Sequence, residues 1–145
     1  MKQLTLFLSI CIFSLQSYSQ LDEVCNASFE SGLSEWQNFA NNGAVASFDT
    51  SSTAAFAGQV GALISVEDIS SGTCVLSSCV ADMFSNQNYK MSFWARSENN
   101  VEVLATISKA TPGYDNFASG NFTLTSEWTL YEIVGSVTED YLGDV

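Results

Sequence analysis

The stretch Tyr89-Lys90-Met91-Ser92-Phe93-Trp94-Ala95-Arg96 decides the fold, because its side chains alternate in character over eight residues. Side chains of a β-strand point alternately to opposite faces of the sheet. One face therefore receives the mainly apolar set Tyr89, Met91, Phe93 and Ala95. The other face receives Lys90, Ser92, Trp94 and Arg96. The stretch predicts a strand with one side in the core and an indole beside a guanidinium on the other side.

Further runs of β-branched and aromatic residues flank this stretch, separated by clusters of Ser, Asn, Gly, Asp and Thr. Such spacing is typical of an all-β sandwich or jelly roll. The predicted strands are 24–29, 44–49, 60–66, 74–80, 88–96, 101–108, 120–124 and 129–137. In 101–108, alternation puts Val101, Val103, Ala105 and Ile107 in the core and Glu102, Leu104, Thr106 and Ser108 opposite. Segment 80–84 is a candidate helical turn, but nothing sustains the 3.6-residue period of a helix.

Residues 1–19 have the features of a signal peptide. Lys2 supplies a charged start, and residues 4–15 form a mostly apolar core that is too short to span a bilayer. Ser17-Tyr18-Ser19 supplies the small-residue cleavage pattern, so cleavage is predicted before Gln20. The domain then comprises residues 20–145, and the protein is expected to be secreted or at the cell surface.

A lipid anchor on Cys11 is the competing interpretation, but Ile10 is a poor small-residue neighbour for a lipoprotein site. No second long apolar run follows, so no membrane insertion is predicted. The formal net charge is −12, and loss of Lys2 with the leader would make it more acidic. Such a field repels phosphate backbones and anionic lipid, which argues against nucleic acid as a partner and favours cations or neutral ligands.

Three cysteines follow the leader: Cys25, Cys74 and Cys79. An oxidising compartment allows at most one bridge among them. If 74–79 is a continuous strand, Cys74 and Cys79 point to opposite faces, which disfavours a bridge between them. The predicted disulfide joins Cys25 to either Cys74 or Cys79. A zinc site is not expected, because the chain has no histidine and too few thiolates.

Four motifs occur in a recognisable order along the chain. They are Asn26-Ala27-Ser28-Phe29-Glu30 with Gly32-Leu33 and Trp36, then Ala57-Gly58-Gln59-Val60-Gly61-Ala62-Leu63, then 89–96, then Glu127-Trp128-Thr129-Leu130-Tyr131-Glu132. This series resembles the carbohydrate-binding modules of the family 4 and family 9 type. The resemblance implies a β-sandwich jelly roll like that of galactose-binding domains. Family members normally continue through another strand pair, so the domain is expected to be incomplete at its C-terminal end.

The resemblance also implies a non-catalytic module that binds a polysaccharide or oligosaccharide and is fused to or associated with a glycoside hydrolase. A pyranose ring needs a flat aromatic face, and its hydroxyls need polar partners. Trp94 and Arg96 are expected to supply both, and Glu102 and Thr106 to add acceptors from a neighbouring strand. Loop 113–117 is expected to border the site with Tyr114 and Phe117. The alternative is that these aromatic rings only pack against covering segments.

A structural calcium ion is the one cofactor that the resemblance implies. Glu30 is the matching carboxylate, and Asp49 is a further candidate ligand on charge alone. The alternative is that Glu30 only caps a turn before Gly32. Trp36, Trp128, Tyr131 and Ile133 are assigned to the core, because they stand among apolar neighbours.

Catalysis finds little support in the sequence. Without histidine there is no Ser-His or Cys-His pair, and there is no G-x-S-x-G elbow. Paired carboxylates remain the only hydrolytic option, and nothing marks one pair among the sixteen acids. The chain is therefore predicted not to be an enzyme. The alternative function is a structural or adhesive β-sandwich of an extracellular protein that binds no sugar.

Overall fold

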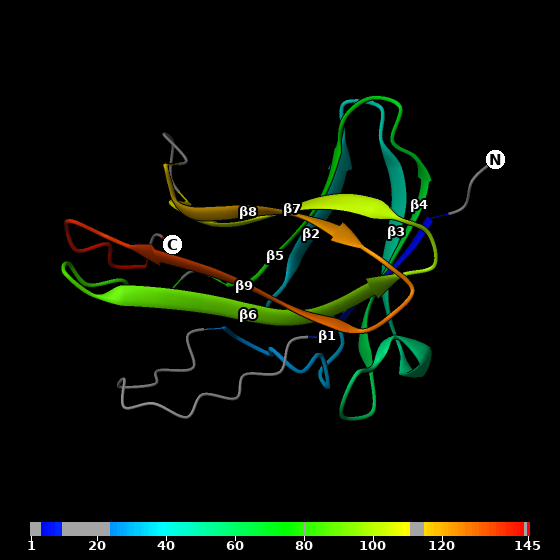
Figure 1. Ribbon diagram of the computed structural model, residues 1–145, viewed down its shortest axis with the longest axis horizontal. Helices are drawn as coiled ribbons and strands as arrows, with labels where there is room; N and C mark the ends of the chain where they lie inside the picture. Colours follow the sequence, from blue (N-terminus) through cyan, green and yellow to red (C-terminus); the bar gives the residue numbers. More distant parts are fainter. Residues whose placement is uncertain (1–3, 10–23, 80, 111–114, 144) are drawn as a thin grey trace.

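The protein is described by a computed structural model that covers the backbone of residues 4–9 and residues 24–79, 81–110, 115–143 and 145 (Figure 1). Its strands are β1 (Leu4–Ser9), β2 (Gln37–Asn41), β3 (Val45–Ser51), β4 (Gly61–Asp68), β5 (Thr73–Ser77), β6 (Asn88–Ser97), β7 (Val101–Ser108), β8 (Asn116–Leu124) and β9 (Thr129–Ser136). One 3₁₀ turn, η1 (Ser52–Ala54), follows β3.

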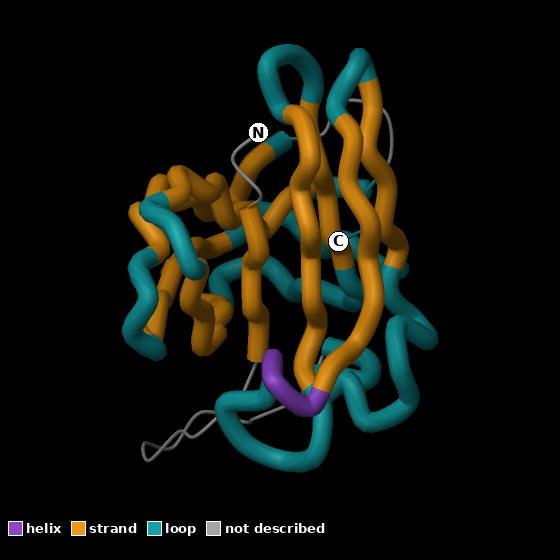
Figure 2. Tube along the Cα trace, turned by 90° about the vertical axis from the view of Figure 1, so that its right-hand side faces the viewer, coloured by secondary structure: helices purple, strands orange, loops and turns teal. Residues whose placement is uncertain are grey.

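The strands form two layers that pack face to face. One layer is a five-stranded antiparallel sheet in the order β3-β4-β1-β6-β9. The facing layer consists of two separate antiparallel pairs, β2-β5 and β7-β8. Figure 1 shows β7 and β8 on one side and β6 and β9 on the other, and Figure 2 shows loops at both ends of the strands. The predicted all-β sandwich is confirmed.

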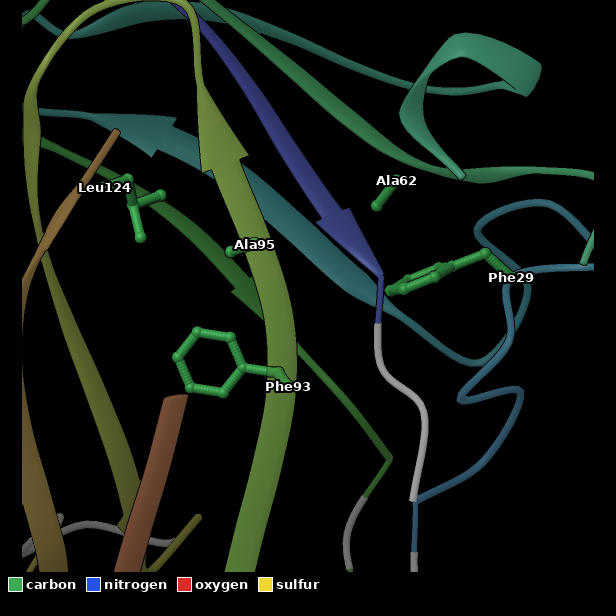
Figure 3. Packing of buried hydrophobic residues seen from close by; sticks show 5 residues of the cluster. All are labelled: Phe29, Ala62, Phe93, Ala95 and Leu124. Atoms are coloured by element: carbon green, nitrogen blue, oxygen red, sulfur yellow. The ribbon is translucent and has the colours of Figure 1, made fainter. Parts of the chain in front are cut away.

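The core lies between the layers and follows the predicted alternation. Phe93 and Ala95 of β6 are 6% and 0% exposed and join Phe29, Ala62 and Leu124 in one cluster (Figure 3). The Phe93 ring lies 6.0 Å from the ring of Phe122 on β8 and 5.6 Å from that of Tyr131 on β9. Other side chains packed on the cluster include Met91, Val103 and Ala105. The core faces predicted for 89–96 and 101–108 are therefore correct.

The strand predicted at 24–29 is wrong, because this segment folds into turns around Asn26. The Asn26 amide donates to the carbonyls of Gly32 and Ser34, and its Oδ1 accepts from the Ser31 amide. Asn side chains compete with strand ladders for backbone groups in this way. The turns hold Phe29 at φ 60° and 0% exposure, 4.7 Å from the Trp36 ring, so the core assignment of Trp36 is confirmed.

Other element boundaries also differ from those predicted. The sequence patterns missed β2, and β8 begins at Asn116, whereas the predicted strand begins at residue 120. The strand predicted at 74–80 ends at Ser77. Part of the predicted leader, Leu4–Ser9, pairs with both β4 and β6. Residues 1–3 and 10–23 lie outside the described residues, and the leader remains a prediction.

The disulfide joins Cys25 to Cys79, which is one of the two predicted pairings. Their Cα atoms lie 5.8 Å apart, within the range that a bridge requires. Cys74 is the remaining thiol on β5, and burial raises the pKa of its side chain. The bridge ties the turn segment before Phe29 to the chain that follows β5.

Candidate functional site

Trp94 and Arg96 lie on the outer side of the five-stranded sheet. They alternate with Phe93 and Ala95, whose side chains fill the core. Trp94 is directly opposite Leu130 of β9, which is 42% exposed. Directly opposite residues share one face of a sheet, so the predicted outer side of β6 is correct.

One face of the Trp94 indole is covered by Phe56, from the loop after η1. The two rings are stacked with centroids 4.0 Å apart and an interplanar angle of 12°. Phe56 also meets Trp128 edge-on at 5.6 Å, and the Arg96 guanidinium lies 5.2 Å from the Trp128 ring. Arg96 Nη2 donates to the carbonyl of Thr53, 3.2 Å away. This outer aromatic cluster of Phe56, Trp94, Arg96 and Trp128 anchors the loop to the sheet.

The core assignment of Trp128 is wrong. Trp128 precedes β9 by one residue and has the parity of Leu130, whose side chain points outward. Tyr131 and Ile133 have the opposite parity and pack in the core, as predicted. The apolar neighbours of Trp128 are thus those of the outer cluster, which the sequence does not distinguish from the interior.

Glu102 and Thr106 do not lie beside Trp94, and this prediction is also wrong. β6 pairs with β1 and β9, whereas β7 pairs with β8 in the facing layer. Val103 and Ala105 point into the core from that layer, so Glu102 and Thr106 point away from it on the far side of the sandwich. A three-residue connection, 98–100, carries the chain from one layer to the other.

The outer side of β7 and β8 is an open polar surface with one exposed leucine. Glu102 is opposite Thr123, whose hydroxyl donates to Glu102 Oε1. Leu104 is opposite Asn121 and is 62% exposed, and Thr106 is opposite Ser119. Two of the predicted sugar-contacting residues, Glu102 and Thr106, therefore share this face.

The outer side of β2 and β5 adds an aromatic ring that sequence reasoning missed. Phe39 is 44% exposed, and no ring contact to it occurs among the described residues. Asn41 is two residues along the same face, and its Oδ1 accepts a 2.7 Å hydrogen bond from the Thr73 hydroxyl. Leu76 of β5 packs on the same core cluster as Val103, so both pairs turn their outer sides away from the five-stranded sheet. We call the outer sides of the two pairs the paired-strand surface. It has two patches, Phe39, Asn41 and Thr73 on β2 and β5, and Glu102, Leu104 and Thr106 on β7, and the two pairs form separate sheets.

The sequence pattern that points to an outward Phe39 covers only five residues. Gln37-Asn38-Phe39-Ala40-Asn41 places three outward positions on one face with an aromatic ring between two amides. Five residues with two Asn and one Gln read as a turn by composition. Only the pairing with β5 makes the segment a strand.

Of the two predicted loop aromatics, Phe117 joins neither surface. Tyr114 lies outside the described residues. Phe117 packs against Tyr141 with ring centroids 4.7 Å apart. The Lys109 ammonium lies over the same Tyr141 ring, 5.7 Å from its centroid. Phe117 thus contributes to packing between β8 and the segment near residue 141.

Glu30 holds a loop through backbone contacts. Its Oε1 accepts from the amides of Gln59 at 2.7 Å and Val60 at 3.3 Å. Asp49 Oδ1 accepts from the Thr50 amide. Calcium takes six to eight oxygen ligands, and no group of three or more acidic, Cys or His side chains suited to a metal occurs in the described part of the chain. Calcium binding at Glu30 or Asp49 remains a prediction.

Replacing Glu30 with alanine is expected to lower the free energy of unfolding by about 1 kcal/mol, because two loop amides lose their acceptor. Glu30→Gln keeps one carbonyl oxygen and should cost less. Urea denaturation with and without calcium chloride measures both effects. Equal stability of Glu30→Ala and the parent in both conditions would contradict the structural role. A calcium-dependent gain in the parent alone would support the predicted ion.

The part of the chain that the structure describes contains no helix long and apolar enough to cross a membrane. The architecture is that of an antiparallel β-sandwich with side chains available for binding on its outer surfaces. A family model described as a carbohydrate-binding domain, of the family 4/9 type, matches residues 22–138. The chain therefore belongs to this family of carbohydrate-binding domains, and the resemblance read from the four motifs is confirmed. No curated protein sequence and no solved structure matched the chain.

Proposed function

We propose that the protein is a non-catalytic carbohydrate-binding module that holds a polysaccharide on the paired-strand surface. Membership of the carbohydrate-binding family supports sugar binding in general. The observation that carries the choice of surface is the exposed ring of Phe39 beside the hydrogen-bonded pair of Asn41 and Thr73. An aromatic face takes the C–H side of a sugar ring, and amides and hydroxyls take its hydroxyl groups.

Glu102 and Thr106 supply polar groups on the other strand pair, on the outer side of β7. Glu102 already accepts from Thr123, which fixes the carboxylate in one position before a ligand arrives. A side chain that is held in place loses less entropy when a ligand binds. Leu104, exposed between them, offers apolar area next to these acceptors.

The outer aromatic cluster is the weaker candidate for the same role. Stacking on Phe56 occupies one face of Trp94, and Arg96 is engaged with Trp128 and the Thr53 carbonyl. A sugar would have to displace these contacts or use the outer face of Phe56, which is 40% exposed. Trp94 and Arg96, the pair predicted from the sequence, therefore form the alternative binding surface.

The proposed role as a carbohydrate-binding module also concerns where the protein acts and with what enzyme. The predicted leader supports secretion or display at the cell surface. A module that only binds is useful when it keeps an attached or associated glycoside hydrolase near its polymer.

Calorimetric titration with soluble β-glucans, xylans and mannans tests the function. We expect one of these polymers to bind, and Phe39→Ala to weaken its affinity by about tenfold, because stacking on an aromatic ring is worth roughly 1 kcal/mol beyond its buried area. Phe84→Ala is the matched control, since Phe84 is 43% exposed and lies outside the paired-strand surface.

Phe56→Ala reports on the alternative surface. Loss of binding in Phe56→Ala with normal binding in Phe39→Ala would move the site to the outer aromatic cluster. No heat with any polymer would remove sugar binding. In that event the second candidate, a structural or adhesive sandwich, is favoured by one observation, the covered face of Trp94.

A further inference from the structure

The outer side of the β2-β5 pair presents three rows of side chains. The two strands run antiparallel, side by side (Figure 1), and each row joins one outward residue of β2 to the residue opposite it on β5. Leu76 of β5 packs on the core cluster, so the residues of the other parity on β5 point outward. The rows are Gln37 with Ser77, Phe39 with Val75, and Asn41 with Thr73.

The two end rows each pair an amide with a hydroxyl. In one row the Thr73 hydroxyl donates to Asn41 Oδ1, 2.7 Å away, so the Asn41 amide nitrogen offers donors and the hydroxyl oxygen still accepts. In the other row Gln37 is exposed, and its side chain makes no hydrogen bond within the described part of the chain. Because sugar hydroxyls both donate and accept, each end row suits the hydroxyls of one sugar unit.

The spacing of the rows sets the size of the ligand. Residues on one face of a strand follow one another at about 7 Å, so the end rows lie about 13 Å apart with the Phe39 ring midway between them. A single pyranose ring stacked on Phe39 is too short to reach both end rows. A linear chain of sugar units that runs along the strands reaches both. The six side chains of the rows carry no charge, so stacking and neutral hydrogen bonds are the contacts that they offer.

We propose that the three rows are successive subsites for a linear chain of at least three sugar units, with the axis of the chain along β2 and β5. This inference rests on the proposed function and goes beyond it, because it assigns the direction of the bound chain, its minimum length and a binding role to Gln37 and Ser77. Phe39 stacks on the central unit. Gln37 with Ser77, and Asn41 with Thr73, hold hydroxyls of the flanking units.

Calorimetry with single sugars and hexasaccharides tests the length of the site. The probes are glucose with cellohexaose and laminarihexaose, xylose with xylohexaose, and mannose with mannohexaose. We expect one hexasaccharide to bind about tenfold or more tightly than its single sugar, because only the longer ligand reaches the end rows. Gln37→Ala should weaken that hexasaccharide by about three- to tenfold, through loss of a hydrogen bond. Asn38→Ala is the matched control, since Asn38 is an exposed amide of the opposite parity on the same strand.

Side-chain amide signals in nuclear magnetic resonance spectra report the direction of the bound chain. The hexasaccharide should shift the signals of Gln37 and Asn41 together and leave that of Asn38 in place. A chain that crosses the strands would shift at most one of the first two.

The outcomes separate this inference from the function on which it rests. If Phe39→Ala weakens hexasaccharide binding but Gln37→Ala binds like the parent, the function stands and the three subsites are overturned. The same holds if the single sugar binds as tightly as the hexasaccharide, or if only one of the two amide signals shifts. If no sugar binds, or if Phe39→Ala binds like the parent, the proposed function or its surface is wrong and the inference falls with it.

Discussion

Phe93→Ala is expected to lower the free energy of unfolding by about 3–5 kcal/mol. The ring is almost fully buried and contacts Phe122 and Tyr131 from two other strands. Its removal loses the free energy gained by burying the ring. It also leaves a cavity that the surrounding strands cannot fill without moving. Single domains are stable by only about 5–15 kcal/mol, so a large part of the total is lost.

Urea denaturation measures the Phe93 effect. Val134→Ala is the control, because Val134 is 64% exposed on the outer side of β9 and a surface truncation there should change stability by no more than about 0.5 kcal/mol. A loss below about 1 kcal/mol for Phe93→Ala would contradict the position of this ring at the centre of the core.

Removal of the disulfide by replacing Cys25 and Cys79 with serine is expected to cost about 4 kcal/mol in the chain-entropy model. The bridge closes a loop with a sequence separation of 54, so its loss releases a large number of unfolded conformations. It also frees the turn segment that carries Phe29 into the core. Thermal unfolding should show a lower midpoint for the double variant than for the parent.

Two comparisons isolate the bridge. Cys74→Ser, which changes the thiol outside the bridge, should have a small effect. A reducing agent should lower the unfolding midpoint of the parent and leave the double variant unchanged. Equal sensitivity of both proteins to the reductant would show that the stabilisation comes from elsewhere.

The difference between the two surfaces explains which parts of the site could be predicted. Alternation correctly put Trp94 and Arg96 on one side of β6, and Glu102 and Thr106 on one side of β7, because side-chain direction is a local property of a strand. The sequence did not reveal that β7 crosses to the other layer. Consecutive strands in a sandwich can pair with one another or face one another, and the choice depends on contacts between residues distant in sequence.

Trp94 illustrates the same limit at one residue. Its outward direction follows from its place between Phe93 and Ala95. The covering of its ring does not follow from the sequence, because Phe56 lies between β3 and β4, distant in the chain, and stacks on the indole through the tertiary fold. Phe39 shows the converse, since pairing with β5 exposes a ring in a segment whose composition suggested a turn.

The sequence by itself determined the all-β class, the family, the core faces of β6 and β7 and the restriction of the disulfide to two pairings. Each of these depends on residue order within a short window or on ordered motifs along the chain. Only the tertiary structure decided that Cys79 is the partner of Cys25, which layer holds Glu102, and that Leu4–Ser9 lies between β4 and β6. These are pairings across long separations, and their free energy comes from packing and hydrogen bonds that exist only once the layers have come together.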